Sequence, residues 1–164
     1  MTLKLEIIGI DPGSRSGAIA MFVRNAGGLL SVLSADLPTI KEGKSEQVSA
    51  AAFARCLKEC DLRGATAWLE NVHSMPKQGV ASSFKFGESV GIVKGVLAAL
   101  GVPLRLVTPA TWQKATMGST AGKDRERIRA EAQQQFPDID LKRKKDHNRA
   151  AALLIAKYGS LQNG

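Results

Sequence analysis

Three short apolar runs near the N-terminus, each followed by residues that favour a turn, constrain the fold of this chain more than any other feature. The runs cover residues 3–10, 17–25 and 29–37. Pro-Gly follows closely on the first run and Ala-Gly-Gly on the second, and clusters of this kind mark the turns between strands. Because such short connections join antiparallel neighbours, the pattern predicts a three-stranded antiparallel meander.

The remainder of the chain alternates between helical and strand patterns. Helices are expected over 45–60, 84–101, 109–114, 124–136 and 149–159, with Gly159 ending the last one, and strands over 65–72 and 102–109. Residues 38–47 are expected to form a polar loop. Strands that follow helical crossovers run parallel to their neighbours. The prediction is therefore a single α/β domain over 1–164, with a mixed five-stranded sheet flanked by helices. That order is typical of the ribonuclease H-like fold.

Three glycines, spaced four residues apart, mark the helix expected over 84–101. Gly87, Gly91 and Gly95 leave a smooth stripe along one side, where another element can approach closely. The same helix carries lysine and glutamate, which argues against a membrane role for this spacing. We interpret the stripe as a surface for close helix packing, and as the candidate surface for association of two copies of the chain.

The charge of the chain favours a polyanionic partner. The 164 residues carry a net charge of +8 with a pI near 9.8, and much of the excess lies in 114–129 and 142–149. A strongly basic small protein often binds nucleic acid, and two solvated basic faces are the alternative. The sequence shows neither an apolar run of about 18 residues nor a signal peptide. We therefore expect a cytoplasmic protein that does not contact a membrane.

Two acidic residues stand at the ends of expected strands. Asp11 follows the apolar run IIGI, and Glu70 follows AWL. If these two strands are neighbours, both carboxylates enter one small volume at the end of the sheet. Two close carboxylates repel each other unless a cation holds them, and ligand sets made of oxygen favour Mg²⁺ or Mn²⁺. From the residues alone an alternative is equally open, in which Glu70 caps a loop. In that case Asp11 pairs with Arg15 or Arg63.

Six segments in series resemble the RuvC family of Holliday junction resolvases, and most closely its phage and prophage branch. They are IIGIDPGSRSGAIA, WLENVHS, SSFKFGESVGIVKGVL, VTPATWQKA, GKDRERIRAEAQQQFP and DHNRAAALLIAKYG. Together they cover nearly the whole chain, in order. The resemblance implies a ribonuclease H-like fold and a homodimeric endonuclease that depends on Mg²⁺, with Mn²⁺ able to substitute. It also implies that the substrate is branched DNA, a four-way junction nicked symmetrically in two opposing strands.

The resemblance assigns roles to individual residues of this sequence. Asp11 and Glu70 match the family's first two catalytic carboxylates and would bind the metal. His73 falls where family members often carry an aromatic residue that stacks on bases at the crossover. The candidate DNA contacts, each with an ordinary solvated side chain as the alternative, are Arg15, His73, Lys77, Lys85, Lys114 and Lys123.

The last motif departs from the family pattern. The family's final helix carries two metal ligands three residues apart, the second just before an Ala-Leu pair, but this chain has Asn148 and Ala151 there. Asp146 is the remaining carboxylate and becomes the candidate catalytic residue and metal ligand, with His147 as a further candidate ligand. Three explanations compete. An acidic residue has been replaced by alanine, which we favour, or the ligands have shifted register, or the protein binds junctions without cutting them.

Two other protein classes share the first motif. A sugar-kinase or actin-like ATPase also places Asp-x-Gly after a strand, but that fold needs two such domains and a second phosphate loop. A nuclease of the YqgF type, which processes precursor ribosomal RNA, is usually shorter and fits the FKFGESVG and WQKA segments poorly. Both are kept as alternatives to a junction resolvase.

Overall fold

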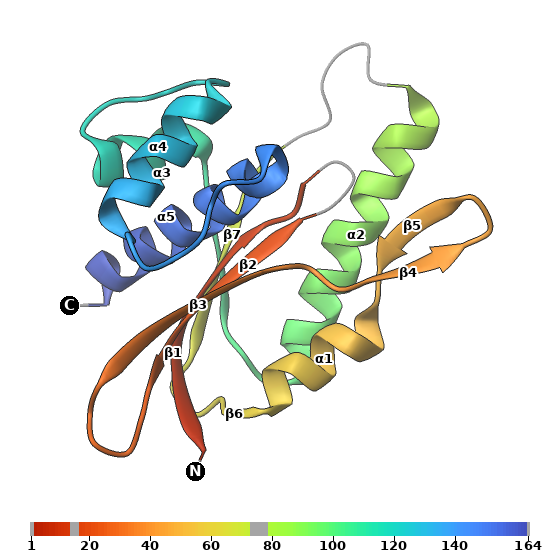
Figure 1. The fold of residues 1–164 in the computed structure, drawn as a ribbon. Coiled ribbons are helices and arrows are strands. Elements are labelled where there is room, and N and C mark those ends of the chain that lie inside the picture. The colour runs from red at the N-terminus through yellow and green to blue at the C-terminus, as the bar shows by residue number, and fades with distance from the viewer. Residues whose placement is uncertain (1, 14–16, 73–78, 164) are drawn as a thin grey trace.

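Three antiparallel strands, two parallel ones and a short sixth strand form the central sheet of the protein. The computed structural model describes residues 2–13, 17–72 and 79–163. The strand order is β3 (Leu30–Asp36), β2 (Ala18–Arg24), β1 (Leu3–Asp11), β7 (Thr66–Glu70) and β8 (Leu104–Val107), with β6 (Cys60–Asp61) paired to the start of β1. β1, β2 and β3 are antiparallel, whereas β7 and β8 run parallel to β1 (Figure 1). The predicted meander and the predicted parallel strands are confirmed.

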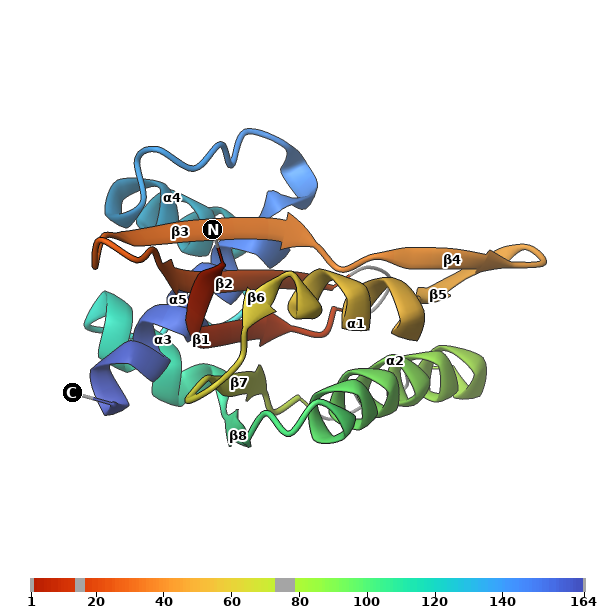
Figure 2. The ribbon, with the colours of Figure 1, turned by 90° about the horizontal axis from the view of Figure 1, so that it is seen from below.

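Helices cover both faces of this sheet (Figures 1 and 2). One face packs against α1 (Ala50–Lys58) and α2 (Val80–Ala99). The other is covered by α3 (Pro109–Met117), α4 (Arg125–Gln135), the 3-10 helix η1 (Lys144–Asp146) and α5 (His147–Gln162). α5 lies against β1 and β2, and its residues 150–156 are all buried. Among the described residues, none of the helices combines the length and the apolar character that a membrane crossing demands.

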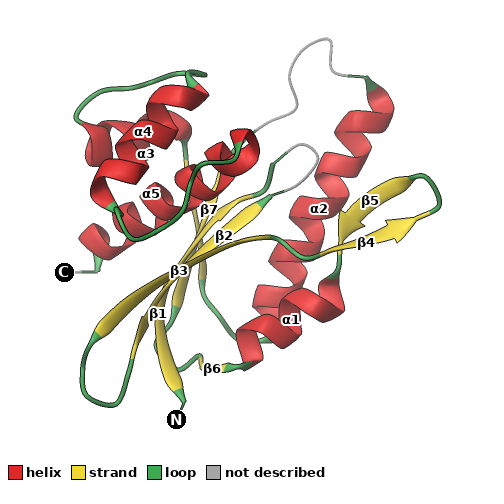
Figure 3. Ribbon diagram, in the orientation of Figure 1, coloured by secondary structure: helices red, strands yellow, loops and turns green. Residues whose placement is uncertain are grey.

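A β-hairpin occupies the segment 38–47, which the sequence pattern assigns to a polar loop. β4 (Thr39–Glu42) pairs with β5 (Ser45–Val48) around a turn at Gly43, whose φ is 63°. The hairpin extends away from the central sheet (Figure 3). The predicted loop is therefore wrong, because a glycine that tolerates positive φ closes the turn and lets the flanking residues pair.

The helix boundaries are set by caps that the periodicity alone does not show. α1 begins after Ser49 rather than at Ser45, because the Ser49 side chain accepts a hydrogen bond from the Ala52 N–H. α2 begins earlier than predicted, at Val80. α3 runs on until Gly118, which ends the helix with a φ of 74°.

Two glycines bring α5 unusually close to the sheet. Gly159 lies inside α5 rather than at its end, so the predicted helix stop is wrong. A Cβ on Gly159 would lie 2.4 Å from Cδ1 of Trp68, and a Cβ on Gly9 would lie 2.2 Å from the carbonyl oxygen of Ala152. Both positions therefore require glycine for packing, since any side chain would push the helix away from β1 and β7.

The three glycines of α2 face away from the rest of the protein. No other part of the described chain lies within 4 Å of a Cβ built at Gly87, Gly91 or Gly95. α2 packs on the sheet instead through Val93 and Leu97. The stripe therefore packs on no described part of its own chain, because the apolar side chains that hold the helix lie on its other side, and its use as a surface between two copies stays a prediction.

Candidate active site

Asp11 and Glu70 meet at one end of the sheet because β1 and β7 are neighbouring parallel strands. Ile10 is paired with Leu69, so the next residue along each strand is a carboxylate at the same edge. Asp11 is buried, with 8% of its surface exposed, and Glu70 is half-buried. The expected adjacency of these strands is confirmed, and we call Asp11 and Glu70 the carboxylate pair.

The carboxylate pair lies in surroundings that disfavour negative charge. Burial raises the pKa of Asp11 to about 7, and the charge of Glu70 adds to the rise. The Gly13 N–H, 3.0 Å from Asp11 Oδ1, and the Arg125 guanidinium oppose this shift in part. Burial also raises the pKa of Glu70, against the hydrogen bond from Trp112. These surroundings disfavour two negative charges side by side, and a divalent cation would favour them.

The described partners of these acids bear on the alternative of a loop cap and an ordinary ion pair in part, because Arg15 lies outside the described residues. Glu70 Oε1 accepts a hydrogen bond from the indole N–H of Trp112 in α3, at 3.0 Å. Arg63 does not pair with Asp11, because its guanidinium forms an ion pair with Asp61 at 2.8 Å. Among the described residues, one hydrogen bond is therefore made to each acid, from the Gly13 N–H to Asp11 and from the Trp112 indole to Glu70.

The beginning of α5 packs beside the strand that carries Asp11. The carbonyl oxygen of Ala152 abuts Gly9, which precedes Asp11 by two residues. Ala151 is buried, with 6% of its surface exposed. Position 151 therefore belongs to the part of α5 that covers β1, and its methyl group provides no ligand.

The structure does not bring Asp146 or His147 to the carboxylate pair. Asp146 is 1% exposed, and its Oδ1 lies 2.6 Å from the Arg143 guanidinium and 3.6 Å from that of Arg149. Burial opposes ionisation, but hydrogen bonds and charge from Arg143 hold the pKa of Asp146 below its usual value. His147 Nδ1 lies 3.1 Å from the carbonyl oxygen of Lys144. Within the described residues, no three carboxylate, histidine or cysteine side chains are grouped to hold a metal.

Comparison with known proteins shows the family to which the chain belongs. No protein-family model matches the chain. Over 123 residues the chain is 32% identical to crossover junction endodeoxyribonuclease RuvC of Nitratidesulfovibrio vulgaris strain Hildenborough. The matched region covers 73% of this chain and 70% of the relative. This chain belongs to the RuvC family. The same enzyme from strain DP4 is also 32% identical, over 122 residues.

Solved structures show that the RuvC fold extends over almost the whole chain. A Thermus thermophilus RuvC structure has a TM-score of 0.64 and 18% identity, covering 95% of this chain and 96% of that one. T. thermophilus RuvC in complex with Holliday junction substrate has a TM-score of 0.67 at 18% identity, over 96% and 93%. The fowlpox virus Holliday junction resolvase has a TM-score of 0.52 at 14% identity, over 96% and 99%. The predicted ribonuclease H-like fold is confirmed.

The candidate DNA contacts suggested by the RuvC resemblance are divided between the two faces of the sheet. Lys114 is exposed on α3, and Lys123 is exposed on the loop before α4, on the same side as α5. Lys85 is exposed on α2, on the opposite side. The remaining three, Arg15, His73 and Lys77, lie outside the described residues.

Two residues outside the predicted set act on the carboxylate pair of this RuvC family member. Trp112 bonds to Glu70 across 42 positions of sequence, and the charge of Arg125, the first residue of α4, reaches Asp11. The sequence signal for Trp112 is its place in the WQKA segment, and Arg125 lies in the basic run 114–129. Neither signal identifies a partner, because the contacts form between distant segments.

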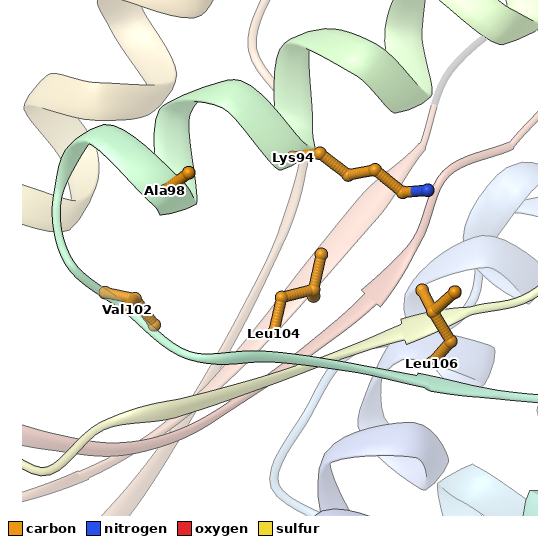
Figure 4. Close-up of a pocket in the computed structure, with 5 residues that line it drawn as sticks. All are labelled: Lys94, Ala98, Val102, Leu104 and Leu106. Atoms are coloured by element: carbon orange, nitrogen blue, oxygen red, sulfur yellow. The ribbon is translucent and has the colours of Figure 1, made fainter.

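A shallow groove between α2 and β8 lies apart from the carboxylate pair. Its lining consists mainly of apolar side chains (Figure 4), namely Lys94, Ala98, Val102, Leu104 and Leu106. The lining includes no acid, so the groove is no candidate for metal-assisted catalysis. It lies beside the exposed face of α2.

Proposed function

We propose that this protein is an endonuclease that resolves four-way DNA junctions with a divalent metal held by Asp11 and Glu70. The observation that carries the proposal is the carboxylate pair, with Asp11 buried and Glu70 half-buried, at the ends of adjacent strands in a chain of the RuvC family. The relatives are named crossover junction endodeoxyribonucleases, and one solved RuvC is in complex with Holliday junction substrate. We therefore favour branched DNA over nucleotides or precursor ribosomal RNA. A cytoplasmic location, where such DNA lies, belongs to the same proposal.

The carboxylate pair fits a hard divalent cation. Both residues offer only oxygen, and Mg²⁺ commonly takes one or two carboxylates together with waters and substrate phosphate oxygens. We propose Mg²⁺, with Mn²⁺ as a substitute. When bound, such a cation lowers the pKa of a water and neutralises charge on the phosphate. The protein itself shields Asp11 and Glu70 from bulk water and orients Glu70 through Trp112.

Basic side chains on the α3–α5 side would bind the DNA backbone next to the carboxylate pair. Lys114 and Lys123 are exposed there, and Arg125 lies close enough for its charge to act on Asp11. Contacts between such cations and phosphates supply affinity without reading sequence, which suits a substrate recognised by its branching. The further proposed contacts are Arg15, His73, Lys77 and Lys85.

Ala151 favours a second candidate function, a protein that binds junctions without cutting them. The RuvC resemblance implies a metal ligand at this position, and a buried alanine supplies none. Asp146 is already paired with Arg143 and Arg149, so a shifted register of ligands receives no support from the contacts of Asp146. We propose that an acid at position 151 is what a complete catalytic site needs.

The deciding experiment compares the parent chain, Ala151→Asp and the double variant Ala151→Asp/Asp11→Asn on a synthetic four-way junction with Mg²⁺. If the proposed function is right, Ala151→Asp nicks two opposing strands and the double variant does not. A linear duplex of the same sequence serves as the substrate control. Tight junction binding without cleavage by any folded variant would support the second candidate and contradict the first.

We propose that two copies of the chain associate through the exposed glycine stripe of α2, because two symmetric nicks require two active sites. Phe84 is 67% exposed at the start of this helix, and Leu106 is 47% exposed in the neighbouring groove. Sedimentation equilibrium would test this against Gly91→Glu, whose side chain enters open space in the single chain. The parent is expected to sediment as a dimer and the variant as a folded monomer. A monomeric parent contradicts the proposal.

A further inference from the structure

Two adjacent buried side chains of α3 reach different parts of the candidate active site. Trp112, 1% exposed, donates to Glu70, and Gln113, 2% exposed, bonds to the backbone of the α3–α4 loop, residues 118–124. We propose that both are positioning residues: Trp112 orients the Glu70 carboxylate, and Gln113 holds the basic loop in place for DNA. The inference rests on the proposed function. It names one residue on which metal binding depends and one on which DNA binding depends.

Trp112 reaches Glu70 because β8 leads directly into α3. Val107 of β8 pairs with Glu70 in the sheet. Thr108 then caps the helix by accepting from the Thr111 N–H, and a proline at the first helical position favours the start. One turn into α3, the indole N–H donates to Glu70 Oε1 at 3.0 Å. An indole N–H is only a donor, so it fixes one carboxylate oxygen as an acceptor and leaves the other for a cation.

Gln113 uses both ends of its amide on the α3–α4 loop. Its Oε1 accepts from the N–H groups of Ala121 at 2.8 Å and Gly122 at 3.1 Å, and its Nε2 donates to the Gly122 carbonyl at 3.3 Å. Lys123 follows directly, and Arg125 opens α4. A loop that is ordered before binding loses less conformational entropy when its cations engage a phosphate. The three bonds of Gln113 therefore favour DNA binding by this loop.

The chain offers a matched control for each residue. Trp68 is also buried, at 6% exposure, and among the described residues its Nε1 has no hydrogen-bond partner. Trp68→Phe therefore removes an indole N–H that orients no carboxylate. Gln133 donates from Nε2 to the carbonyl oxygen of Ile139 at 3.0 Å and to those of Phe136 and Pro137 at 3.4 Å, so Gln133→Met removes a similar set of bonds from a different loop. If packing alone mattered, Trp112→Phe and Trp68→Phe would change binding equally, and so would Gln113→Met and Gln133→Met.

Calorimetric titration of the full chain with Mn²⁺ tests Trp112. Trp112→Phe is expected to bind Mn²⁺ about tenfold more weakly than the parent, the lower end of what losing a group that orients a metal ligand costs. Trp68→Phe is expected to bind Mn²⁺ as the parent does. In Trp68→Phe, Trp112 is the only tryptophan left, so saturable quenching of its emission by Mn²⁺ reports directly on the indole beside Glu70.

Binding of a fluorescently labelled four-way junction in EDTA tests Gln113 without any metal. Gln113→Met keeps the volume of the side chain and loses its hydrogen bonds. It is expected to bind the junction about tenfold more weakly, because the loop is then ordered only on binding. Gln133→Met is expected to bind as the parent does. Thermal unfolding checks each variant, and Gln113→Ala and Trp112→Tyr replace any variant that does not fold.

Each role has an outcome that overturns it. Equal Mn²⁺ affinity in the parent and Trp112→Phe, or an equal loss in Trp68→Phe, overturns the role of Trp112. Equal junction affinity in the parent and Gln113→Met, or an equal loss in Gln133→Met, overturns the role of Gln113. A parent chain that binds neither Mn²⁺ nor the junction contradicts the proposed function itself, and both positioning roles fall with it.

Discussion

At the scale of single residues, Asp11 and Glu70 are acids held close together with little water around them. Burial and the neighbouring acid raise the pKa of Asp11 to about 7, compared with about 4 for an ordinary aspartate. A carboxylate with such a shift, at the end of a sheet, is typical of a group that binds a metal or transfers a proton. The protein keeps this unfavourable arrangement because the fold brings the two strand ends together, and a cation would relieve it.

Asp11→Asn is expected to stabilise the metal-free protein. The native pKa of Asp11 lies above its unfolded value, so its contribution to stability is lost as the pH rises from about 4 to about 7. The neutral amide removes that loss, which amounts to a few kcal/mol because one pKa unit corresponds to about 1.4 kcal/mol. Urea unfolding in EDTA, well above and well below neutral pH, measures the effect. Mg²⁺ should raise the Tm of the parent but not that of Asp11→Asn. If Asp11→Asn is less stable than the parent at high pH, the expectation is contradicted.

Asp146→Asn is expected to destabilise the fold and to leave Mn²⁺ affinity unchanged. The partners of Asp146 hold its pKa below the usual value, so its contribution to stability is present near neutral pH and is lost as the pH falls below about 4. Losing a hydrogen-bonded charge in this position costs about 1–3 kcal/mol. Thermal unfolding at several pH values tests this, with the exposed Asp138→Asn as control. A loss of Mn²⁺ binding would return Asp146 to the metal site.

At the scale of elements, α5 is the helix on which the site depends most. Its first turn is tied to β3, because the Arg149 guanidinium donates to the carbonyl oxygen of Ser34 at 2.9 Å. The segment before it is tied there too, since the guanidinium of Arg143, which precedes η1, lies 3.2 Å from Asp36. Its later turns lie on the sheet through glycine contacts. The helix that the RuvC resemblance assigns to metal ligands is therefore held at both ends, and a substituted side chain at position 151 would enter a defined place.

Gly159→Ala and Gly95→Ala are expected to change stability in opposite directions. The added methyl group at Gly159 collides with the Trp68 ring, and overpacking of this kind costs about 1–3 kcal/mol. At Gly95 the methyl group meets open space on an exposed helix, where alanine is better than glycine by about 1 kcal/mol. Urea unfolding of both variants, each made in the Gly91→Glu background so that association at the glycine stripe does not contribute, measures the difference. Equal effects would show that α5 does not pack on β7 as described.

At the scale of the whole molecule, the sheet separates two surfaces with different properties. The carboxylate pair, Lys114 and Lys123 belong to the side covered by α3, α4 and α5 (Figure 1). The exposed glycine stripe and the apolar groove belong to the α2 side. On the proposed function, the α3–α5 side would bind DNA next to the carboxylate pair, and the α2 side, which also carries Lys85, would hold the two copies together.

Junction binding is expected to weaken steeply as salt rises, because the net charge of +8 implies phosphate contacts that release counterions. Lys123→Ala should reduce the slope of log affinity against log salt by about one, as for the loss of a single phosphate contact. Lys58, exposed at the end of α1 on the other face, provides the control. Fluorescence anisotropy over a salt series measures both slopes. An unchanged slope in Lys123→Ala contradicts its role.

Local patterns in the sequence determined the strands, their order and the two strand-end acids. An apolar run and the turn residues beside it determine the conformation of only a few neighbouring positions. The meander, β7 and β8 could therefore be predicted from the sequence. The resemblance to RuvC rests on the same local segments and placed Asp11 and Glu70 in the site. The exceptions were also local: the turn at Gly43 and the cap at Ser49 carry weaker signals than hydrophobic periodicity.

Only the tertiary structure decided which distant groups meet. The Trp112–Glu70 bond spans 42 positions and the Arg143–Asp36 pair spans 107, and the second belongs to the network that takes Asp146 away from the carboxylate pair. Gly159 looked like a helix end, whereas the ring of Trp68 makes it a packing position. The physical reason is the same in each case. A residue's type and neighbours fix its local conformation, but its hydrogen bonds, burial and pKa depend on surfaces that come together after folding.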